Sequence, residues 1–223
     1  ECFTKPVKID GRIGMSIQAR ADTAAREIRL LETLGRVPVL IRFYNHETEK
    51  EWRVSAETAR RLHDAGHPVS AALVQDRRSV LEPDRWKAFT GFVLAQLHDF
   101  ADRVEIGHAV NRVKWGLWTV NEYLQLLEIA AGHRVQYPRV KFMGPAVIDF
   151  EYHYLVAILK ALPPSFKFSA LSHHLYVDRR GAPENCQGAF SALEKFALAR
   201  AIAEWSPACE KQLIISETNW PLK

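Results

Sequence analysis

Residues 103–112 read Arg-Val-Glu-Ile-Gly-His-Ala-Val-Asn-Arg, and residues 213–221 read Leu-Ile-Ile-Ser-Glu-Thr-Asn-Trp-Pro. Each segment is a short apolar run with β-branched residues that leads directly into polar side chains. Runs of this kind indicate buried strands. Similar runs recur along the chain at intervals of roughly 25 to 45 residues, which is the length of a strand, a helix and two loops. The sequence therefore predicts repeated βα units around a parallel sheet.

Seven strands are predicted, and most are almost continuously apolar, as is typical of strands covered on both faces. Apolar stripes at helical spacing separate them. One such helix follows Thr119, and the spacing of Thr119 and Glu122 predicts a capping box at its start. The predicted strands are Arg12–Gln18, Val37–Tyr44, Pro68–Gln75, Arg103–Gly107, Pro138–Met143, Lys167–Tyr176 and Gln212–Ser216.

The predicted fold class is α/β, and the architecture is a (β/α)8 TIM barrel. No proline- or serine-rich linker divides the chain, so we expect residues 1–223 to form one domain. A closed barrel needs eight strands, and seven are predicted before Lys223. We therefore expect the last helix-strand-helix portion of the barrel to be absent from this chain. A doubly wound open sheet is the alternative, but the first turn, residues 17–22, has no GxGxxG sequence.

The composition of the 223 residues, 48% hydrophobic and 25% charged, is that of a soluble globular protein. No run approaches the roughly 18 to 20 apolar residues that span a bilayer. The formal net charge is +4, but Lys and Arg are interspersed with acids, so we expect no nucleic-acid partner. The three cysteines form no CxxC pair, and reduced thiols favour a cytoplasmic over a secreted protein without fixing the localisation. No cofactor is expected.

Polar side chains gather where each predicted strand ends. The carboxyl ends of barrel strands surround one shared mouth, so these residues predict a functional pocket there. In chain order the groups are Gln18; Arg42, Tyr44, Asn45 and His46; Gln75, Asp76 and Arg77; His108, Asn111 and Arg112; Asp149 and Glu151; His173, His174 and Tyr176; and Glu217, Asn219 and Trp220.

The segment 105–112, followed by Trp115-Gly116, resembles the strand-four sequence E-I-G-N-E-P-N of the clan A glycoside hydrolases. These are retaining enzymes on (β/α)8 barrels. Residues 216–221, Ser-Glu-Thr-Asn-Trp-Pro, are similar to the family's segment at the end of strand seven, and the resemblance implies that Glu217 is the nucleophile. The segment departs from the family at the catalytic pair, because His108-Ala109 stands where the family has Asn and the acid/base Glu.

Further positions match in the correct order. Arg42 matches the strand-two arginine that holds the nucleophile carboxylate, and His174 and Tyr176 match a strand-six H-x-Y whose tyrosine bonds the nucleophile. Gly144-Pro145, placed after strand five, also fits. The resemblance implies a carbohydrate ligand, either an oligosaccharide or a polysaccharide. We expect that ligand to be bound by Arg42, Gln75, Asp76, Asn111, His174, Tyr176 and Trp220.

Retaining cleavage uses two carboxyl groups roughly 5 to 5.5 Å apart, one as nucleophile and one as acid/base. Ala109 has no proton to donate. Four explanations are open: an introduced Glu→Ala change, which leaves His108 unexplained; His108 as the replacement acid; a relocated carboxylate such as Asp76, Asp149 or Glu151; or a natural relative that binds sugar without turnover. The sequence thus favours a glycoside hydrolase with a lost or relocated acid/base, with a carbohydrate-binding pseudoenzyme as the alternative.

A metal-dependent hydrolase or isomerase is a third alternative. His46, His108 and His174 end strands two, four and six, and Asp76 or Glu217 could add an oxygen ligand. Barrel amidohydrolases carry H-x-H on strand one, whereas this chain has Ser16-Ile17-Gln18 there and no HExxH anywhere. We therefore predict no metal.

Overall fold

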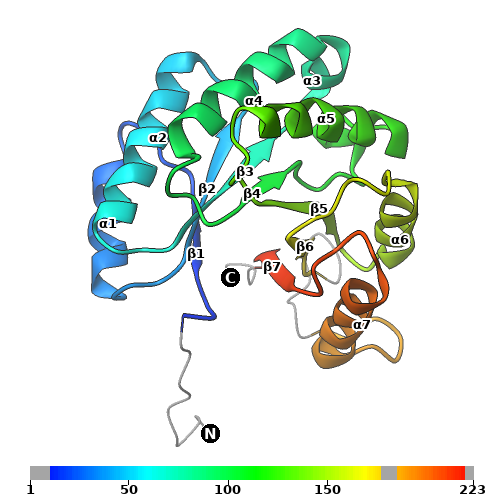
Figure 1. Ribbon diagram of the computed structural model, residues 1–223. Helices are drawn as coiled ribbons and strands as arrows, with labels where there is room; N and C mark the ends of the chain where they lie inside the picture. Colours follow the sequence, from blue (N-terminus) through cyan, green and yellow to red (C-terminus); the bar gives the residue numbers. More distant parts are fainter. Residues whose placement is uncertain (1–10, 177–184, 219–223) are drawn as a thin grey trace, which may run out of the picture.

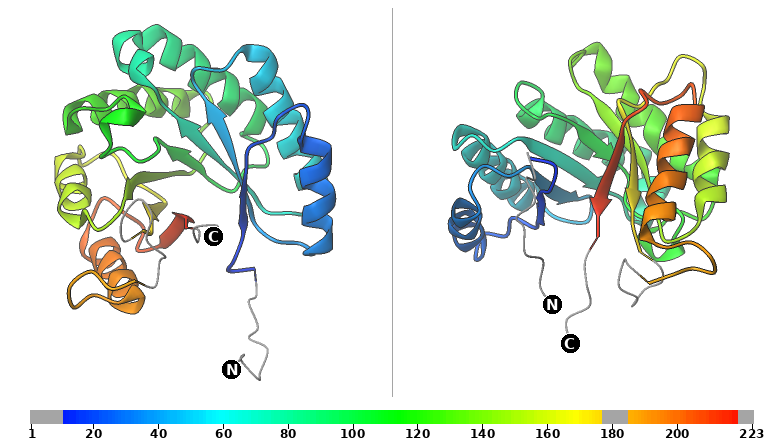
Figure 2. Two further views of the ribbon diagram at one scale, coloured as in Figure 1. Left: turned by 180° about the vertical axis from the view of Figure 1, so that it is seen from behind. Right: turned by 90° about the horizontal axis from the view of Figure 1, so that it is seen from below.

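The computed structural model describes residues 11–176 and 185–218. Its seven strands are all parallel and follow one another in chain order, β1-β2-β3-β4-β5-β6-β7. The sheet curls into a half-barrel with the helices along its outer side (Figure 1). Figure 2 shows the same arc from behind and from below. The chain is therefore an α/β protein, as predicted.

The seven predicted strands are confirmed, but the fifth lies further along the chain than predicted, at Phe142–Ile148 instead of Pro138–Met143. We expected β5 to end at Met143 with Gly144-Pro145 after it, whereas the strand runs on to Ile148. The pairing with β6 shifts between Pro145 and Val147, and the amide of Ala146 donates to the side chain of Ser172 at 3.2 Å. This irregularity accommodates the proline inside the strand. The strands are β1 (Met15–Ile17), β2 (Val39–Tyr44), β3 (Val69–Val74), β4 (Val104–Ile106), β5 (Phe142–Ile148), β6 (Ala170–His174) and β7 (Leu213–Glu217).

The helices pack apolar stripes against the outer face of the sheet. In α2, Trp52, Ala56, Ala59 and Leu62 are buried at helical spacing, and the helix begins with a capping box that joins Thr48 and Glu51. One crossover holds two helices, α3 and α4. The helices are α1 (Ala24–Thr33), α2 (Glu49–Asp64), α3 (Arg77–Leu81), α4 (Pro83–Leu97), α5 (Val120–Gly132), α6 (Tyr152–Ala161) and α7 (Ala192–Trp205), with short 3-10 turns η1 (Val113–Trp115) and η2 (His133–Val135).

Only half of the capping box predicted at α5 is present. The side chain of Thr119 accepts from the amide of Glu122 at 3.2 Å. The Glu122 carboxylate, however, accepts from the amide of Trp118 at 2.7 Å and pairs with Arg77. The glutamate therefore fastens the preceding loop to α3 as well as starting the helix.

The concave face of the sheet carries Arg42 and Glu105, two charged residues of the site. The strand register aligns Arg42 with Ala72, Ala72 with Glu105, and Glu105 with Met143, so these four side chains share one face. Burial alternates along β2, because its outward residues meet helices while the others face the interior of the half-barrel. The prediction that the strands are covered on both faces is wrong for β2.

The two edge strands approach each other across the open side of the arc. A cavity of about 280 Å³ lies between them, lined by Met15 and Ser16 of β1 and by Ile214 and Ser216 of β7. The curl thus brings the first and seventh strands to the same interior. Within residues 11–176 and 185–218, no helix is long and apolar enough to cross a membrane.

Candidate active site

Glu217, the last residue of β7, is held by two donors from other strands. Arg42 Nη2 of β2 forms a hydrogen-bonded ion pair with Glu217 Oε2. Tyr176, two residues beyond β6, donates its hydroxyl proton to Glu217 Oε1 at 2.9 Å. Each carboxylate oxygen therefore has its own donor, and the carboxylate plane is fixed at the carboxyl ends of β2, β6 and β7. This is the contact geometry that the sequence resemblance predicts for these three residues.

The electrostatic setting keeps Glu217 ionised. Burial acts to raise the pKa of its carboxyl, but His174, Arg42 and the Tyr176 hydrogen bond outweigh it and lower that pKa below its usual value. Burial and the neighbouring carboxylate raise the pKa of Tyr176, so its hydroxyl keeps the proton that it donates. The site therefore presents a fixed negative charge.

A strained turn carries His108 and Ala109. Gly107 and Ala109 both have positive φ, +89° and +43°, and a Cβ at residue 107 would lie 2.7 Å from Val110 Cγ1. The turn is secured by Gln75, whose side-chain amide accepts from the His108 amide at 2.8 Å and donates to the His108 carbonyl at 2.9 Å. The side chain of Ala109 is fully buried. Only a methyl group occupies the position where the resemblance expects a carboxyl.

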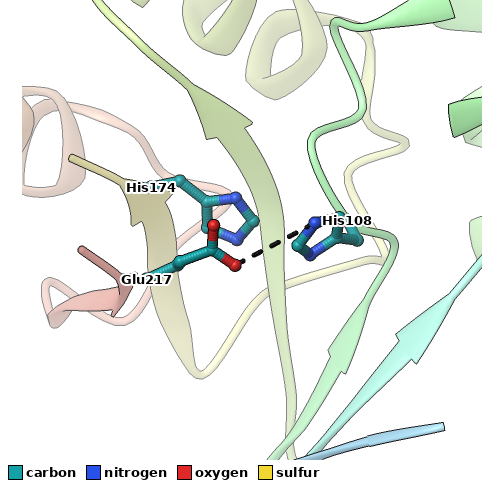
Figure 3. A group of neighbouring side chains, drawn as sticks. All are labelled: His108, His174 and Glu217. Carbon is teal, nitrogen blue, oxygen red and sulfur yellow. Dashed lines mark ion pairs between the residues drawn. The ribbon is translucent and has the colours of Figure 1, made fainter. Parts of the chain in front are cut away.

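His108 turns its imidazole toward Glu217 (Figure 3). Its Nε2 lies 4.0 Å from Glu217 Oε2, which is too long for a hydrogen bond. Burial, followed by repulsion from His174, lowers the pKa of His108 to about 2. The ring is therefore neutral in this environment, and its approach to Glu217 is not an ion pair.

His174 and Glu105 form a buried pair beneath the site. His174 Nε2 lies 3.9 Å from Glu105 Oε2, and both side chains are about 1% exposed. Neither oxygen of Glu105, nor Nδ1 of His174, has a hydrogen-bond partner within the described part of the chain. Polar groups buried in this way carry a desolvation cost and are uncommon in native proteins.

Two of the predicted ligand-binding residues, Gln75 and Asp76, have internal partners that do not include Glu217. Gln75 bonds the His108 backbone, as above, and also the carbonyl of Trp115 at 3.1 Å. Asp76 caps α3 by accepting from the amide of Ser79 at 3.0 Å, and it accepts from Asn45 at 2.8 Å. Their contact with a ligand stays a prediction.

Asn111 joins the turn after β4 to the end of β5. It donates to the carbonyl of Ile148 at 3.0 Å and accepts from the Ile148 amide at 2.9 Å. It also donates to Glu151, and Arg112 forms ion pairs with both Glu151 and Asp149. These polar residues therefore brace the rim of the site, and a role of Asn111 toward a ligand stays a prediction.

The remaining predicted positions lie apart from Glu217 or outside the described residues. Trp220 belongs to the second group. His46 packs on the ring of Tyr44 at 5.3 Å and lines a cavity of about 670 Å³ over the ends of β1 and β2. Gln18 and Glu47 line the same cavity, whereas Glu217 does not. We place the candidate chemistry at Glu217, and not at this cavity, because the Arg42–Glu217 ion pair and the two buried imidazoles of His108 and His174 lie there.

Glu105 is the site residue that sequence reasoning assigned to structure alone. The signal for it was a carboxylate inside an otherwise apolar strand, Val104-Glu105-Ile106. Strand alternation places it on the same face as Arg42. Its pairing with His174 depends on the distance between β4 and β6, which local sequence does not encode.

No protein-family model matches this chain, and no curated protein matches it. Solved structures do match at low identity. One of them is the complex of the virulence factor SghA with its substrate analogue salicin, with a TM-score of 0.45 and 12% identity over 69% of this chain. The chain spans about half of that structure, 52% of its length. A similarity this remote assigns neither a family nor a function.

Proposed function

We propose that this protein binds a carbohydrate at the carboxyl ends of its strands, and that Glu217 is placed as the nucleophile of a retaining glycoside hydrolase without the usual acid/base. The observation that carries the proposal is the pair of donors on Glu217, one from Arg42 and one from Tyr176. They hold the carboxylate ionised and orient it, which is what a nucleophile needs.

The mechanism that fits is double displacement. An oxygen of Glu217 attacks the anomeric carbon, the bond from that carbon to the leaving oxygen breaks, and a glycosyl ester forms. Water then cleaves the ester and returns the carboxylate. Both steps, the formation of the glycosyl ester and its hydrolysis, are ordinarily assisted by an acid/base. That assistance is worth about two to four powers of ten in rate.

The described residues around Glu217 supply a poor acid/base. Ala109 offers only a methyl group, and His108 is neutral and buried. Asp76 caps a helix, while Asp149 and Glu151 are paired with Arg112. Burial opposes the shift at Glu151, but its bonds to Asn111 and Arg112 lower the pKa of that carboxyl, which makes it a weaker proton donor at neutral pH. Substrates whose leaving group departs unprotonated are therefore the ones expected to react.

The finer fold assignment is part of the same proposal. Consecutive parallel strands with helices outside them are the arrangement of the (β/α)8 barrels of clan A, to which we assign this half-barrel. A closed barrel places an eighth strand between β7 and β1, and that closure is a prediction.

Covalent labelling tests the nucleophile. Aryl glycosides with very good leaving groups, across a panel of sugars, are expected to release their phenol in a burst and to add one glycosyl mass to the peptide that contains Glu217. Glu217→Gln keeps the size of the side chain and should abolish both signals. A burst that persists in Glu217→Gln, or a label on another residue, would overturn the assignment.

A non-catalytic sugar-binding protein is the second candidate. It is favoured by Ala109 together with the neutral His108, which leave the strand-four position without a proton donor. Isothermal titration with the same sugars decides between the two. Measurable binding without any labelled Glu217 would establish the pseudoenzyme and exclude the retaining mechanism.

A further inference from the structure

Three donor side chains from three strands converge at the carboxyl ends of the sheet. His108 follows β4, His174 ends β6 and Glu217 ends β7. One ring nitrogen of each histidine and one carboxylate oxygen all lie within 4.8 Å of one another. Figure 3 shows the two imidazoles and the carboxylate facing each other. Both histidines are buried, while the Glu217 side chain remains 20% exposed on the solvent side.

Two imidazoles and one carboxylate are the ligand set of open zinc sites and of several other transition-metal sites. With bonds of about 2.0 to 2.2 Å, tetrahedral ligand atoms lie about 3.3 Å apart. The observed separation of His108 Nε2 and Glu217 Oε2 is 4.0 Å. This pair therefore needs to close by less than about 1 Å, which side-chain rotation supplies.

A second observation points to a ligand. His174 is 1% exposed, and its Nδ1 has no hydrogen-bond partner among the residues that the structure describes. Its other nitrogen, Nε2, lies 3.9 Å from Glu105 Oε2. In metal sites, a carboxylate next to a ligating histidine orients the ring and makes it a stronger ligand. Glu105 lies next to His174 in this way, at a distance longer than a hydrogen bond. A bound cation would also compensate the charge of a Glu105 carboxylate, whose oxygens accept no hydrogen bond from the described residues.

We propose that His108, His174 and Glu217 bind a divalent first-row transition cation of the zinc type, with Glu105 as the residue that positions His174. Three protein ligands would leave a coordination position for water or another ligand. The site goes beyond the proposed carbohydrate function and does not depend on it. It does share Glu217 with that function, so a bound cation and a glycosyl ester exclude each other.

Arg42 provides a prediction about zinc affinity that is specific to this proposal. Its guanidinium bonds Oε2 of Glu217, the same oxygen that faces His108. A cation at this oxygen meets a positive charge and competes for a lone pair. Arg42→Gln should therefore bind zinc more tightly than the wild type, by roughly tenfold or more, although it weakens Glu217 as a nucleophile.

The test is direct binding of the metal alone. Wild-type protein, cleared of metal with a chelator, is titrated with Zn²⁺ in a calorimeter and with Co²⁺ in a spectrophotometer. We expect one ion per chain, absorption of tetrahedral Co²⁺, and no competition by Mg²⁺, which prefers oxygen ligands. His108→Asn should lower the affinity more than about 100-fold and remove the cobalt signal.

Controls separate this site from other zinc ligands. His46→Asn removes a histidine outside the cluster, and Cys186→Ser removes an exposed thiol. Both should keep the wild-type affinity. Absence of stoichiometric binding in the folded wild type, or wild-type affinity in His108→Asn, would overturn the proposal. Because no sugar is present, neither result bears on the labelling of Glu217.

Two measurements, zinc affinity and the thermal midpoint, test the positioning role of Glu105. Glu105→Gln is expected to lower zinc affinity about 10- to 100-fold. The same change removes a buried charge and should raise the thermal midpoint of the metal-free protein. A merely structural Glu105 would give the reverse pattern, a lower midpoint with unchanged zinc affinity, and that pattern would remove Glu105 from the proposal.

Discussion

Gln75 and His108 are joined by two hydrogen bonds, because the side-chain amide of Gln75 accepts from the backbone amide of His108 and donates to its carbonyl. The glutamine thereby continues the pairing of β3 with β4 beyond the last ladder residues. It holds a turn in which Gly107 and Ala109 have left-handed backbone conformations. The position of the His108 ring thus depends on a side chain from the neighbouring strand.

Gln75→Ala is expected to destabilise the protein by about 2 to 4 kcal/mol, because it leaves the buried backbone groups of His108 and the carbonyl of Trp115 without partners. Urea unfolding measures the change. Gln96→Ala, on the exposed face of α4, is the matched control and should alter stability by less than about 0.5 kcal/mol. Equal stability of the two variants would show that the Gln75 bonds are dispensable.

Tyr176→Phe should slow the labelling of Glu217 by about 10- to 100-fold, since a hydrogen bond to a charged group contributes about 1.5 to 3 kcal/mol. The burst rate with an activated aryl glycoside measures it. Tyr137→Phe serves as the control, because Tyr137 stacks on His98 and does not contact Glu217. A wild-type burst rate in Tyr176→Phe would mean that this bond does not orient the nucleophile.

The labelling rate should have a single, acidic limb. The pKa of Glu217 is lowered from 4.5, so its side chain is ionised at pH 4.5 and above. The labelling rate falls only when the pH drops through this lowered pKa and the carboxylate becomes protonated. His108, with a pKa of about 2, does not titrate near neutrality. The rate is therefore expected to be flat between roughly pH 5 and pH 9. An alkaline limb inside this range would reveal a proton donor that assists the reaction and would contradict the proposed loss of the acid/base.

Introducing the Asn-Glu pair of the clan A strand-four sequence at positions 108 and 109 should create hydrolysis. The double variant His108→Asn with Ala109→Glu supplies a carboxyl group near Glu217 and is expected to raise turnover of unactivated glycosides by about 10² to 10⁴. The same variant loses an imidazole of the proposed zinc cluster. Because Ala109 is fully buried, the larger side chain needs space, so the thermal midpoint is measured alongside the rate. A folded double variant without any gain would place the acid/base elsewhere.

Much of the fold follows from local sequence. Short apolar runs such as Val39-Leu40-Ile41 and Leu213-Ile214-Ile215 form strands of the parallel sheet. The contact of Arg42 and Tyr176 with Glu217 was implied by the resemblance of their segments to strands two, six and seven of the clan A glycoside hydrolases. These predictions needed only patterns within each segment and their order.

The rest depends on contacts between segments. Where β5 continues past Pro145, the amide of Ala146 donates to the hydroxyl of Ser172 on β6. The hydrogen bonds of Gln75 and Asn111 likewise depend on the position of a neighbouring strand. The pairing of Glu105 with His174 spans two strands that are not adjacent. Such relations are set by the curl of the sheet, which no single segment records.

The ion pair between Arg42 and Glu217 also constrains the stage of folding at which the site can form. The two residues are 175 positions apart in the sequence, whereas each strand pairs only with the strands next to it in chain order. During synthesis from the N-terminus, the arginine and both imidazoles leave the ribosome before the carboxylate. The complete site can therefore form only once β7 has joined the sheet, and a ligand specific for the complete site would detect that event.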